Sequence, residues 1–476
     1  MKRLIKVPRQ LHILANKLAA KSFDGWVTGG AVRDVFLGIP AKDIDVVFTG
    51  GTLEQIQDAV EEHVPIRRKV VSNAPVFHAM IGGEWMDIAV ARIDILRPHV
   101  QMGTGQMDDF DFLTGFDQDG NPITIVEDLR RRDFTVNAMA WNIRTNVLID
   151  PFNGQFDLRW NNGQGRLMPI DPSLFRRSAE RVLRAAQLRA RFGFALSPAL
   201  ITVAREMAPF VLQVPKEQWW RHFEKILMSR DPGAGIRALV WMGLGPHIPG
   251  WEAMANTEQD KIWHPEGTVD VHTLMVLNVA NKLTERSDLD SRRVVMMAAL
   301  VHDIVKPLVT ETNEDGRITS RGHDRRELLE PMAMEFMSFV GFPHRLRSRV
   351  VNIAVCHMRS APSAKSVRKL ARDLAPATIS DWALLVMSDM AGRSVPDEEI
   401  QEGWSSVAKT VASAQSMNMQ HSAPQPLVMG RHLIDLGMVP GPGFGPILSA
   451  AFDAQLDGFF DSAESGIQWL KDNGFV

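Results

Sequence analysis

The chain has 476 residues, so we expect two to four domains rather than a single core. A hydrophobic content of 45% and a charged content of 23% are typical of a globular protein, and without an apolar run of about 18 residues the sequence predicts no transmembrane helix. The net charge of −3 excludes a polycation, and the single cysteine, Cys356, excludes an internal disulfide and a cysteine-built zinc site and fits a reducing cytoplasm.

Short apolar runs alternate with helical segments over the first 155 residues and predict a small mixed sheet with helices. These runs lie at residues 27, 46–48, 76–81, 86–90 and 147–149. Residues 103–122 are rich in glycine and aspartate, so we expect them to form a loop.

Residues 29–47, GGAVRDVFLGIPAKDIDVV, combine paired glycines, a helical stretch and two aspartates. Paired glycines let a backbone approach a phosphate closely. Asp43 and Asp45 alternate along a strand and share one face, where two carboxylates repel each other unless a cation binds between them. Because Mg²⁺ takes carboxylate oxygens and substrate phosphates, this segment predicts a site for a metal-bound nucleoside triphosphate. Asp87, which is polar within the apolar run of residues 85–90, is either a third carboxylate of that site or a solvent-facing strand residue.

Residues 127–191 contain twelve arginines and no lysine, against seven acidic residues. A charged run is usually a solvated helix face, but arginine alone favours forked recognition of phosphates or base edges.

Three motifs in this part of the chain resemble those of one family. GGAVRD followed by DID, RRDFTVNA at residues 131–138 and DPFNG at residues 150–154 are similar to the nucleotidyltransferase signatures of the class II CCA-adding enzymes and the bacterial poly(A) polymerases. The resemblance implies that Asp43, Asp45 and Asp87 are catalytic and that the first two bind Mg²⁺. It also implies that the nucleotide contacts Gly29, Gly30, Arg33, Arg132, Asp133 and Asn137.

The helix predicted over residues 180–194 has apolar residues at three- and four-residue spacing, with Arg181 and Arg184 one turn apart on one face. It resembles the nucleobase-reading helix of the same family, in which an aspartate and an arginine pair with the base edge. The resemblance therefore implies that Arg181 and Arg184 bind the nucleotide. PKEQW at residues 215–219 is similar to the family's tRNA-contacting neck segment, or is an ordinary helix start.

The nucleobase-reading helix departs from the family at three positions. Arg177 and Ser178 occupy the places of a Glu-Asp pair, and Gln187 stands where many members carry arginine. Loss of the carboxylate leaves three alternatives: Glu180 or another acid substitutes for it, nucleotide specificity is relaxed, or activity is impaired.

Six of the fourteen histidines fall between residues 264 and 357. A lone histidine on an apolar helix is usually packed, whereas an adjacent His-Asp pair flanked by further histidines and aspartates suits Mn²⁺, Fe²⁺, Ni²⁺, Co²⁺ or Mg²⁺, which can activate water for phosphoester hydrolysis. The pattern resembles the all-helical HD phosphohydrolases, in particular the HD domain fused to CCA-adding enzymes, although Val305 replaces the glycine of HDxGK. The resemblance implies metal ligation by His272, His302, Asp303 and Asp389, with His323 and His357 as auxiliary ligands.

The predicted fold class is α+β multidomain. It comprises a mixed-sheet nucleotidyltransferase head (1–155), a helical neck with nucleobase- and RNA-binding elements (156–255), an all-helical HD domain (256–400) and a helical tail (401–476).

Taken together, the resemblance implies a tRNA nucleotidyltransferase that adds CCA to tRNA 3′ ends from CTP and ATP by two-metal transfer. Mg²⁺ would serve the head and a second divalent metal the HD site, with tRNA as partner, no membrane partner and the oligomeric state open. Three alternatives remain: a poly(A) polymerase, an RNA-binding protein with a degenerate head, motivated by Arg177 and Ser178, and a protein in which the HD site alone is active.

Overall fold

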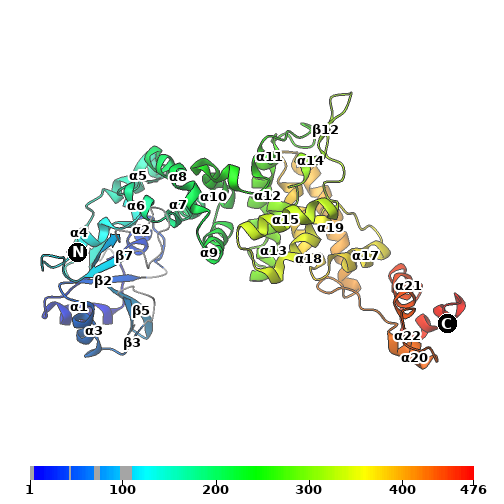
Figure 1. Ribbon diagram of the computed structural model, residues 1–476, viewed down its shortest axis with the longest axis horizontal. Helices are drawn as coiled ribbons and strands as arrows, with labels where there is room; N and C mark the ends of the chain where they lie inside the picture. The colour runs from blue at the N-terminus through cyan, green and yellow to red at the C-terminus, as the bar shows by residue number, and fades with distance from the viewer. Residues whose placement is uncertain (1–4, 42–43, 69–75, 97–109) are drawn as a thin grey trace. The chain divides into compact units, whose positions relative to one another are not determined.

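The computed structural model describes the chain except for residues 1–4, 42–43, 69–75 and 97–109. The chain forms two compact units, Met1–Gly245 and Pro246–Val476, which are described separately (Figure 1). The finer division into head, neck, HD domain and tail stays a prediction. Within the described residues, no helix is both long enough and apolar enough to cross a membrane.

A seven-stranded mixed sheet organises the start of the first unit, with strands in the order β3-β4-β5-β2-β1-β8-β9. β2 and β5 are parallel, and the other neighbouring strands are antiparallel. Each apolar run named above falls on one of these strands, so the predicted mixed sheet is confirmed. The strands are β1 (Asp24–Thr28), β2 (Asp45–Thr49), β3 (Ile66–Arg68), β4 (Val76–Ile81), β5 (Glu84–Val90), β8 (Ala140–Asn142) and β9 (Leu148–Ile149).

The prediction of a loop over residues 103–122 is wrong for part of that segment. Residues Phe110–Thr114 form strand β7, which pairs antiparallel with β6 (Arg92–Leu96). The sequence FDFLT contains two aromatic residues and a β-branched threonine, which favour a strand once β6 supplies a ladder, despite the glycine-rich surroundings. Residues 103–109 lie outside the described residues.

The first unit also contains helices, several of which carry the arginine-rich segment of residues 127–191. Gly193, with φ +76°, ends the predicted nucleobase-reading helix, α7, in the left-handed conformation that glycine adopts without strain. The helices are α1 (Arg9–Ala19), α2 (Gly30–Phe36), α3 (Leu53–Glu61), α4 (Ile125–Arg130), α5 (Gly154–Gly163), α6 (Ser173–Arg177), α7 (Glu180–Phe192), α8 (Pro198–Val211), α9 (Lys216–Leu227) and α10 (Pro232–Leu239), with a short 3₁₀ turn, η2 (Thr135–Asn137).

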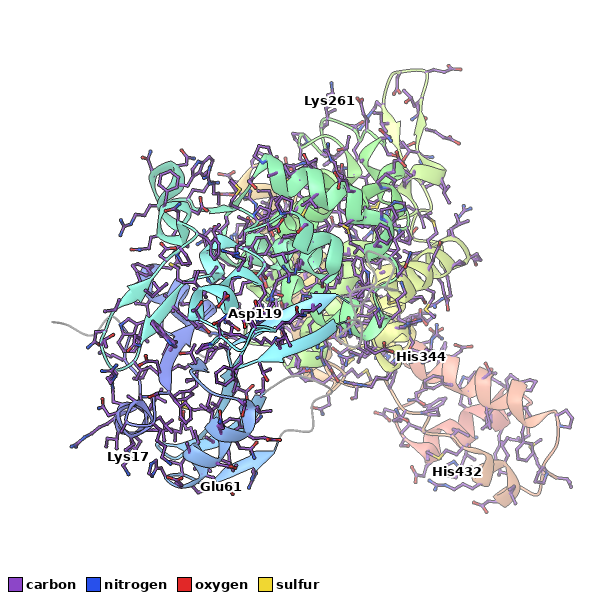
Figure 2. The ribbon with its side chains drawn as sticks, turned by 60° about the vertical axis from the view of Figure 1, so that its left-hand side comes forward. Lys17, Glu61, Asp119, Lys261, His344 and His432 are labelled. Carbon is purple, nitrogen blue, oxygen red and sulfur yellow. The ribbon has the colours of Figure 1, made fainter. Side chains whose placement is uncertain are left out.

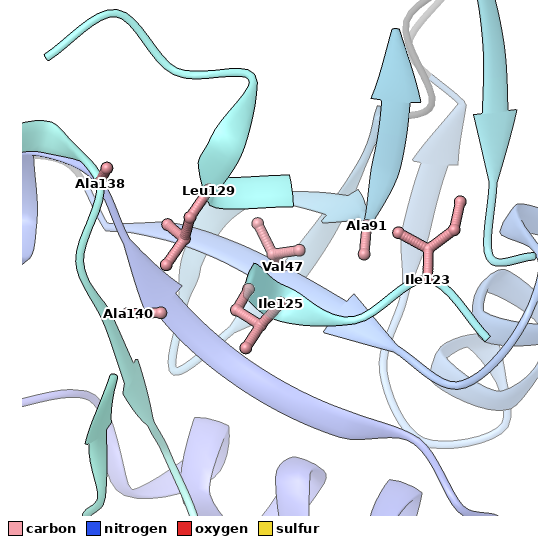
Figure 3. Packing of buried hydrophobic residues seen from close by; sticks show 7 residues of the cluster. All are labelled: Val47, Ala91, Ile123, Ile125, Leu129, Ala138 and Ala140. Carbon is pink, nitrogen blue, oxygen red and sulfur yellow. The ribbon is translucent and has the colours of Figure 1, made fainter. Parts of the chain in front are cut away.

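One buried cluster joins motifs that lie far apart in the sequence. β2, α4 and the segment that leads into β8 each contribute small aliphatic side chains to it (Figure 3). Because Asp45 begins β2 and the RRDFTVNA motif runs from the end of α4 to Ala138, packing of the cluster brings Asp45 and this motif together. Its members are Val47, Ala91, Ile123, Ile125, Leu129, Ala138 and Ala140.

The second unit is almost entirely helical. Its central helix, α13, has eight consecutive buried residues from Val294 to Val301, as expected of a helix that is apolar all round. The fold class predicted from the sequence, a mixed-sheet head followed by helices, is therefore confirmed. The helices are α11 (Trp251–Ala255), α12 (Val269–Leu283), α13 (Leu289–Val301), α14 (Lys306–Val309), α15 (Arg326–Phe339), α16 (Arg347–Val355), α17 (Ala364–Leu374), α18 (Ile379–Ala391), α19 (Asp397–Ser416), α20 (Gly430–Asp435), α21 (Phe444–Asp457) and α22 (Ala463–Asp472).

The last three helices share a small core of their own, and α21 contacts α17. Figure 2 labels charged and polar side chains on both units. Lys17, Glu61 and Asp119 are exposed on the first unit, and Lys261 and His344 are exposed on the second.

We expect Leu129→Ala to destabilise the first unit by about 2–5 kcal/mol, because Leu129 is fully buried in the shared cluster and its truncation leaves a cavity. Hydrogen exchange of the β2 amides measures the opening free energy of this region without requiring the whole chain to unfold in two states. Val147→Ala is the control, since Val147 is half exposed and its truncation should change stability by less than about 0.5 kcal/mol. Equal protection of both variants would contradict the role assigned to the cluster.

Candidate functional sites

A cavity of about 600 Å³ in the first unit is lined by residues of α2, β2, the segment that follows α4, and α7. Six arginines and three aspartates line it, so its described wall carries an excess of positive charge that suits an anionic ligand. Its lining residues are Gly29, Gly30, Ala31, Arg33, Asp34, Asp45, Arg131, Arg132, Asp133, Asn137, Arg181, Arg184, Gln187, Leu188 and Arg191.

Gly29 brings the backbone close to the charged wall of this cavity. Its φ is +70°, and a Cβ atom at this position would lie 2.7 Å from Arg132 Nη1 and 3.4 Å from Asp45 Oδ2. A side chain here would be strained and would displace the guanidinium. The positive φ and the close approach of Arg132 both explain why a glycine lies between β1 and α2.

A chain of buried polar contacts links α2, η2 and α7. Asp133 accepts a hydrogen bond from Asn137 at 3.0 Å and forms an ion pair with Arg184 at 3.1 Å. Asn137 in turn accepts from Arg33 at 2.6 Å, and Arg33 donates twice to Asp34. These contacts fix the positions of charged groups that would otherwise repel one another.

Arg33 and Arg191 are also held from the other side. Arg191 Nη2 lies 3.2 Å from Asp34 Oδ2, and both guanidinium groups lie within 4.6 Å of the centre of the Phe192 ring. Arg33 is buried, with 4% of its surface exposed, so its guanidinium serves as a rigid part of the cavity wall.

A second acid, Asp128, positions the arginine pair before Asp133. Its fully buried carboxylate accepts two hydrogen bonds from Arg131 and lies 3.5 Å from Arg132 Nη2, which also donates to Thr28. Arg181 donates to the backbone carbonyls of Arg131 and Arg132 at 2.9 and 3.3 Å. The predicted base-reading helix is thereby tied to the RRDFTVNA motif.

The predicted carboxylates have different outcomes. Asp45 is exposed at the start of β2 and lines the cavity, whereas Asp43 lies outside the described residues. Asp87 precedes Ile88 on β5 as Asp45 precedes Val46 on β2, and the parallel register of these strands places both aspartates on one face. Asp87 pairs with His78 at 2.9 Å and is not among the described residues that line the cavity. Asp45 and Asp87 are oxygen donors that fit Mg²⁺, and Asp43 would complete the predicted pair.

A smaller cavity of about 410 Å³ lies beside Ser178, one of the positions at which the sequence departs from the family's base-reading motif. Ser178, Glu180, Arg181 and Arg184 line it, together with three residues of α9. The Glu180 carboxylate accepts from His222 at 2.5 Å and forms an ion pair with Arg221 at 3.0 Å, while His222 also contacts Gln187. Glu180 is therefore an acid beside Arg184 that is already engaged by two α9 side chains. The predictions that depend on Arg177 concern a side chain outside the described part.

The second unit gathers the predicted metal ligands around Asp303, which follows α13. Asp303 Oδ2 lies 3.7 Å from His272 Nε2 and 3.3 Å from His302 Nε2, and Asp389 lies 2.9 Å from His272. The other oxygen of Asp303, Oδ1, lies 3.4 Å from His323 Nε2 and 4.0 Å from His357 Nε2. All six predicted residues thus meet in one cluster with two groups of donors.

The orientation of three of the four histidine rings fits divalent cations. Three of the four rings donate through Nδ1 to a backbone carbonyl: His302 to Ala299, His323 to Ser320 and His357 to Ala354. Their Nε2 atoms face the centre of the cluster. Burial lowers the pKa of His357 to about 4, so that its ring is neutral at pH 7 and can ligate a metal.

Unsatisfied atoms in the same cluster give the test of fit. Within the described part of the chain, His302 Nε2 and both oxygens of Asp303 are buried without a hydrogen bond of good geometry, although Lys306 Nζ forms an ion pair at 2.7 Å with Oδ2. Buried polar atoms without partners are costly unless a ligand satisfies them. The imidazole and carboxylate set suits Mn²⁺, Fe²⁺, Co²⁺ or Ni²⁺.

A cavity of about 690 Å³ opens beside this cluster. Lys306 and three arginines line it together with Asp303 and the exposed ring of Trp263. Cations next to a cluster of candidate metal ligands suit a phosphate ester. Val305, which replaces the family's glycine, has φ −87° and a fully buried side chain, so its backbone conformation does not require glycine. The three arginines are Arg321, Arg359 and Arg393.

The sequence predicted most but not all residues of these sites. All eight residues predicted to bind nucleotide line the head cavity with Asp45. Asp34 and Arg191 were missed there, although Asp34 belongs to the GGAVRD motif and Arg191 to the helix predicted over residues 180–194. In the second unit Glu266 and Lys306 were missed, although Glu266 lies two residues after His264 and Lys306 lies three residues after Asp303. These four residues act on neighbouring side chains, a relation that linear spacing does not reveal.

Two family models match the chain. The Poly A polymerase head domain matches residues 25–162 and the HD domain matches residues 269–387. Two curated relatives, each named Multifunctional CCA protein, come from Stenotrophomonas maltophilia strains K279a and R551-3 and are 36% and 35% identical over 292 residues. The matched region covers 60% of this chain and 64% of each relative, which is less than two thirds of their length.

Solved structures are similar over almost the whole chain. The Bacillus stearothermophilus CCA-adding enzyme in complex with CTP has a TM-score of 0.65 at 18% identity, covering 98% of this chain and 97% of that one. The Thermotoga maritima CCA-adding enzyme complexed with tRNA has a TM-score of 0.54 at 19% identity, covering 99% and 97%. At these identities the likeness concerns the fold.

The chain therefore matches a Poly A polymerase head domain in its first part and an HD domain further on, as its motifs predicted. It has the fold of the CCA-adding enzymes, and the curated proteins named Multifunctional CCA protein are among its relatives.

We expect Asp133→Asn to lower the thermal unfolding temperature at pH 7, because it removes the ion pair with Arg184. The loss should be equivalent to only about 1 kcal/mol, since the Arg184 side chain is exposed and solvent weakens the pair. Burial opposes ionisation of Asp133, but the charge of Arg184 and the hydrogen bond from Asn137 hold its pKa below the usual 3.8. A lowered folded-state pKa stabilises above the unfolded value and loses that effect as pH falls through the folded pKa. Calorimetry should therefore show the difference between the two proteins shrinking below about pH 3.8. A difference that grows on acidification would contradict this account.

Proposed function

We propose that this chain is a tRNA nucleotidyltransferase that adds C, C and A to tRNA 3′ ends from CTP and ATP. The observation that carries the proposal is the convergence of all eight predicted nucleotide-binding residues and Asp45 on one cationic cavity. The names of the curated relatives and the solved complexes of CCA-adding enzymes with CTP, ATP and tRNA support the same substrates.

The reaction joins the RNA 3′-hydroxyl to the α-phosphate and releases pyrophosphate. Gly29 lets the backbone approach the triphosphate, and Arg132, held by Asp128 and Thr28, presents its guanidinium beside it. Mg²⁺ held by Asp43 and Asp45, with Asp87 on the adjoining strand, would supply Lewis-acid activation of the hydroxyl and neutralise phosphate charge. Because Arg132 is held by Thr28 and Asp128 before substrate binds, this guanidinium needs little reorganisation in the transition state.

Arg184 is the base-reading residue most accessible to a nucleotide. Its side chain is 58% exposed and forms an ion pair with Asp133, whereas Arg181 donates to backbone carbonyls. An arginine fork donates to acceptors on cytosine or adenine, and Glu180, beside it in the smaller cavity, is the acid available to accept from the exocyclic amine. This requires Glu180 to exchange its contact with Arg221 for the base.

The RNA would follow the neck, where Arg221 and Lys225 of α9 face the smaller cavity. The proposal assigns residues 1–155 to the head, 156–255 to the neck, 256–400 to the HD domain and 401–476 to the tail. A reducing cytoplasm suits the single thiol, Cys356.

The HD domain carries a second activity, hydrolysis of phosphoesters such as 2′,3′-cyclic phosphates or terminal phosphates. Asp303 and the four histidines around it would hold divalent cations, which would generate a nucleophilic water. Lys306 and the arginines of the adjacent cavity bind the phosphate and keep it over the cluster.

The first test incubates the protein with tRNA lacking its 3′ CCA, Mg²⁺ and labelled CTP or ATP, separately and together. We expect ordered addition of C, C and A. Asp45→Ala should reduce incorporation about 1,000-fold, since it removes several kcal/mol of transition-state stabilisation. Asp119→Asn is the matched control, because Asp119 is an exposed aspartate of the same unit and should leave the rate unchanged.

Other results of this assay assign other functions. A long A tail would identify a poly(A) polymerase. RNA binding without incorporation would leave an RNA-binding protein with a degenerate head, and hydrolysis that survives in such a protein would leave the HD site as its sole activity.

For the HD domain, we expect Asp303→Ala to abolish hydrolysis of a 2′,3′-cyclic nucleotide while CCA addition continues, because the two sites use separate residues. Hydrolysis is measured by chromatography with Mn²⁺, Co²⁺, Ni²⁺ or Mg²⁺ added, and chelation of the metal should abolish it as well. Glu314→Gln, an exposed change on the same unit, is the control. Hydrolysis that persists in Asp303→Ala would refute the HD assignment.

A further inference from the structure

His272 differs from the other three histidines of the HD cluster in what holds its ring. The Nδ1 atoms of His302, His323 and His357 meet the backbone carbonyl three residues earlier. His272 Nδ1 instead lies 2.9 Å from Oε1 of Glu266, a side chain.

The position of His272 on its helix accounts for this difference. His302 and His357 follow the last turns of α13 and α16, where carbonyl groups lack helical donors and can accept from a ring. His272 lies in the first turns of α12, where the preceding carbonyls take part in the helix and its own N–H bonds to Thr268. A ring at this position needs an acceptor from elsewhere in the fold.

Glu266 is itself fixed from three directions. Its Oε1 faces His264 Nδ1 and His272 Nδ1, both at 2.9 Å, and its Oε2 accepts from the backbone N–H of Ser394 at 3.0 Å. The side chain is 2% exposed. Ser394 follows α18, the helix that carries Asp389, so Glu266 connects the two helices whose side chains meet at the cluster.

We propose that Glu266 is a positioning residue of the HD metal site. It holds a proton of His272 on Nδ1, so that Nε2, which lies 2.9 Å from Asp389 Oδ1 and 3.7 Å from Asp303 Oδ2, is the ring nitrogen that would bind the cation in place of a proton. The inference rests on the proposed HD function, since it assumes that the cluster binds a divalent cation. A carboxylate behind a metal-ligating histidine fixes both the tautomer and the orientation of the ring and makes the ring a stronger metal ligand.

The alternative, a further metal ion between His264, Glu266 and His272, fits less well. His272 would then need lone pairs on both ring nitrogens, which the neutral imidazole does not have. Hydrogen bonds from two Nδ1–H groups to one buried carboxylate oxygen use the same atoms at an ordinary distance.

The test compares wild type with Glu266→Gln, Glu266→Asp and Glu266→Ala in the full chain. Binding of Mn²⁺ at pH 7.5 is measured by calorimetric titration, with Asp303→Ala defining the binding that does not involve the HD site. Co²⁺ absorption reports the ligand field, and the Tm of the metal-free protein reports folding.

We expect Glu266→Ala to weaken Mn²⁺ binding about 10–100-fold and to alter the Co²⁺ spectrum. Glu266→Gln should fall between alanine and wild type, because its amide oxygen keeps an acceptor but loses the charge. Its metal-free Tm should stay close to that of wild type, and CCA addition should be unchanged. Should alanine prevent folding, the glutamine and aspartate variants carry the test.

Unchanged Mn²⁺ affinity and Co²⁺ spectra in the variants would overturn the inference, including when the Tm falls, since that result assigns Glu266 a structural role alone. A wild-type protein that binds no more Mn²⁺ than Asp303→Ala would refute the proposed HD metal site and the inference with it. Equal affinity for a site that wild type does bind would refute only the role of Glu266.

Discussion

The head cavity depends on the ion pair with Arg184 and the hydrogen bond from Asn137 that hold the buried carboxylate of Asp133. Six arginines around one cavity repel each other, and without buried acids the wall would not hold its shape. Asp133, Asp34 and Asp128 each hold two or more polar groups, so the arginines keep fixed positions while the wall keeps an excess of positive charge. Such a surface is arranged for an anionic substrate before one arrives.

The second unit meets the opposite electrostatic requirement. It collects imidazole nitrogens and carboxylate oxygens, which suit a cation, at the buried C-terminal end of helix α13. Carbonyl groups at helix ends orient His302 and His357, a loop carbonyl orients His323, and the Glu266 carboxylate orients His272. Both units therefore place charged groups in their interior and stabilise them with a surrounding layer of hydrogen bonds.

The departures from the family pattern have different physical meanings. Val305 is accommodated because its backbone lies in the ordinary helical region, so the family's glycine is not required for the turn. Ser178 is different, because it removes a charge next to Arg184 that the structure does not replace at the same position. Glu180 is near, but His222 and Arg221 already engage its carboxylate. A change of residue matters where it alters charge inside a cavity more than where it alters volume in a tolerant turn.

The sequence by itself predicted most strands of the mixed sheet, the helical second unit and most of the motif residues that meet in the two sites, because alternating apolar runs and short motifs are local properties. It could not find β7, since a strand in a glycine-rich segment forms only when a partner strand is present. Nor could it find Asp34, Arg191 or Glu266 as supports, because what each one holds is decided by residues that come into contact only on folding. Tertiary structure decided those roles, since hydrogen bonds and ion pairs depend on distance in space and not on distance along the chain.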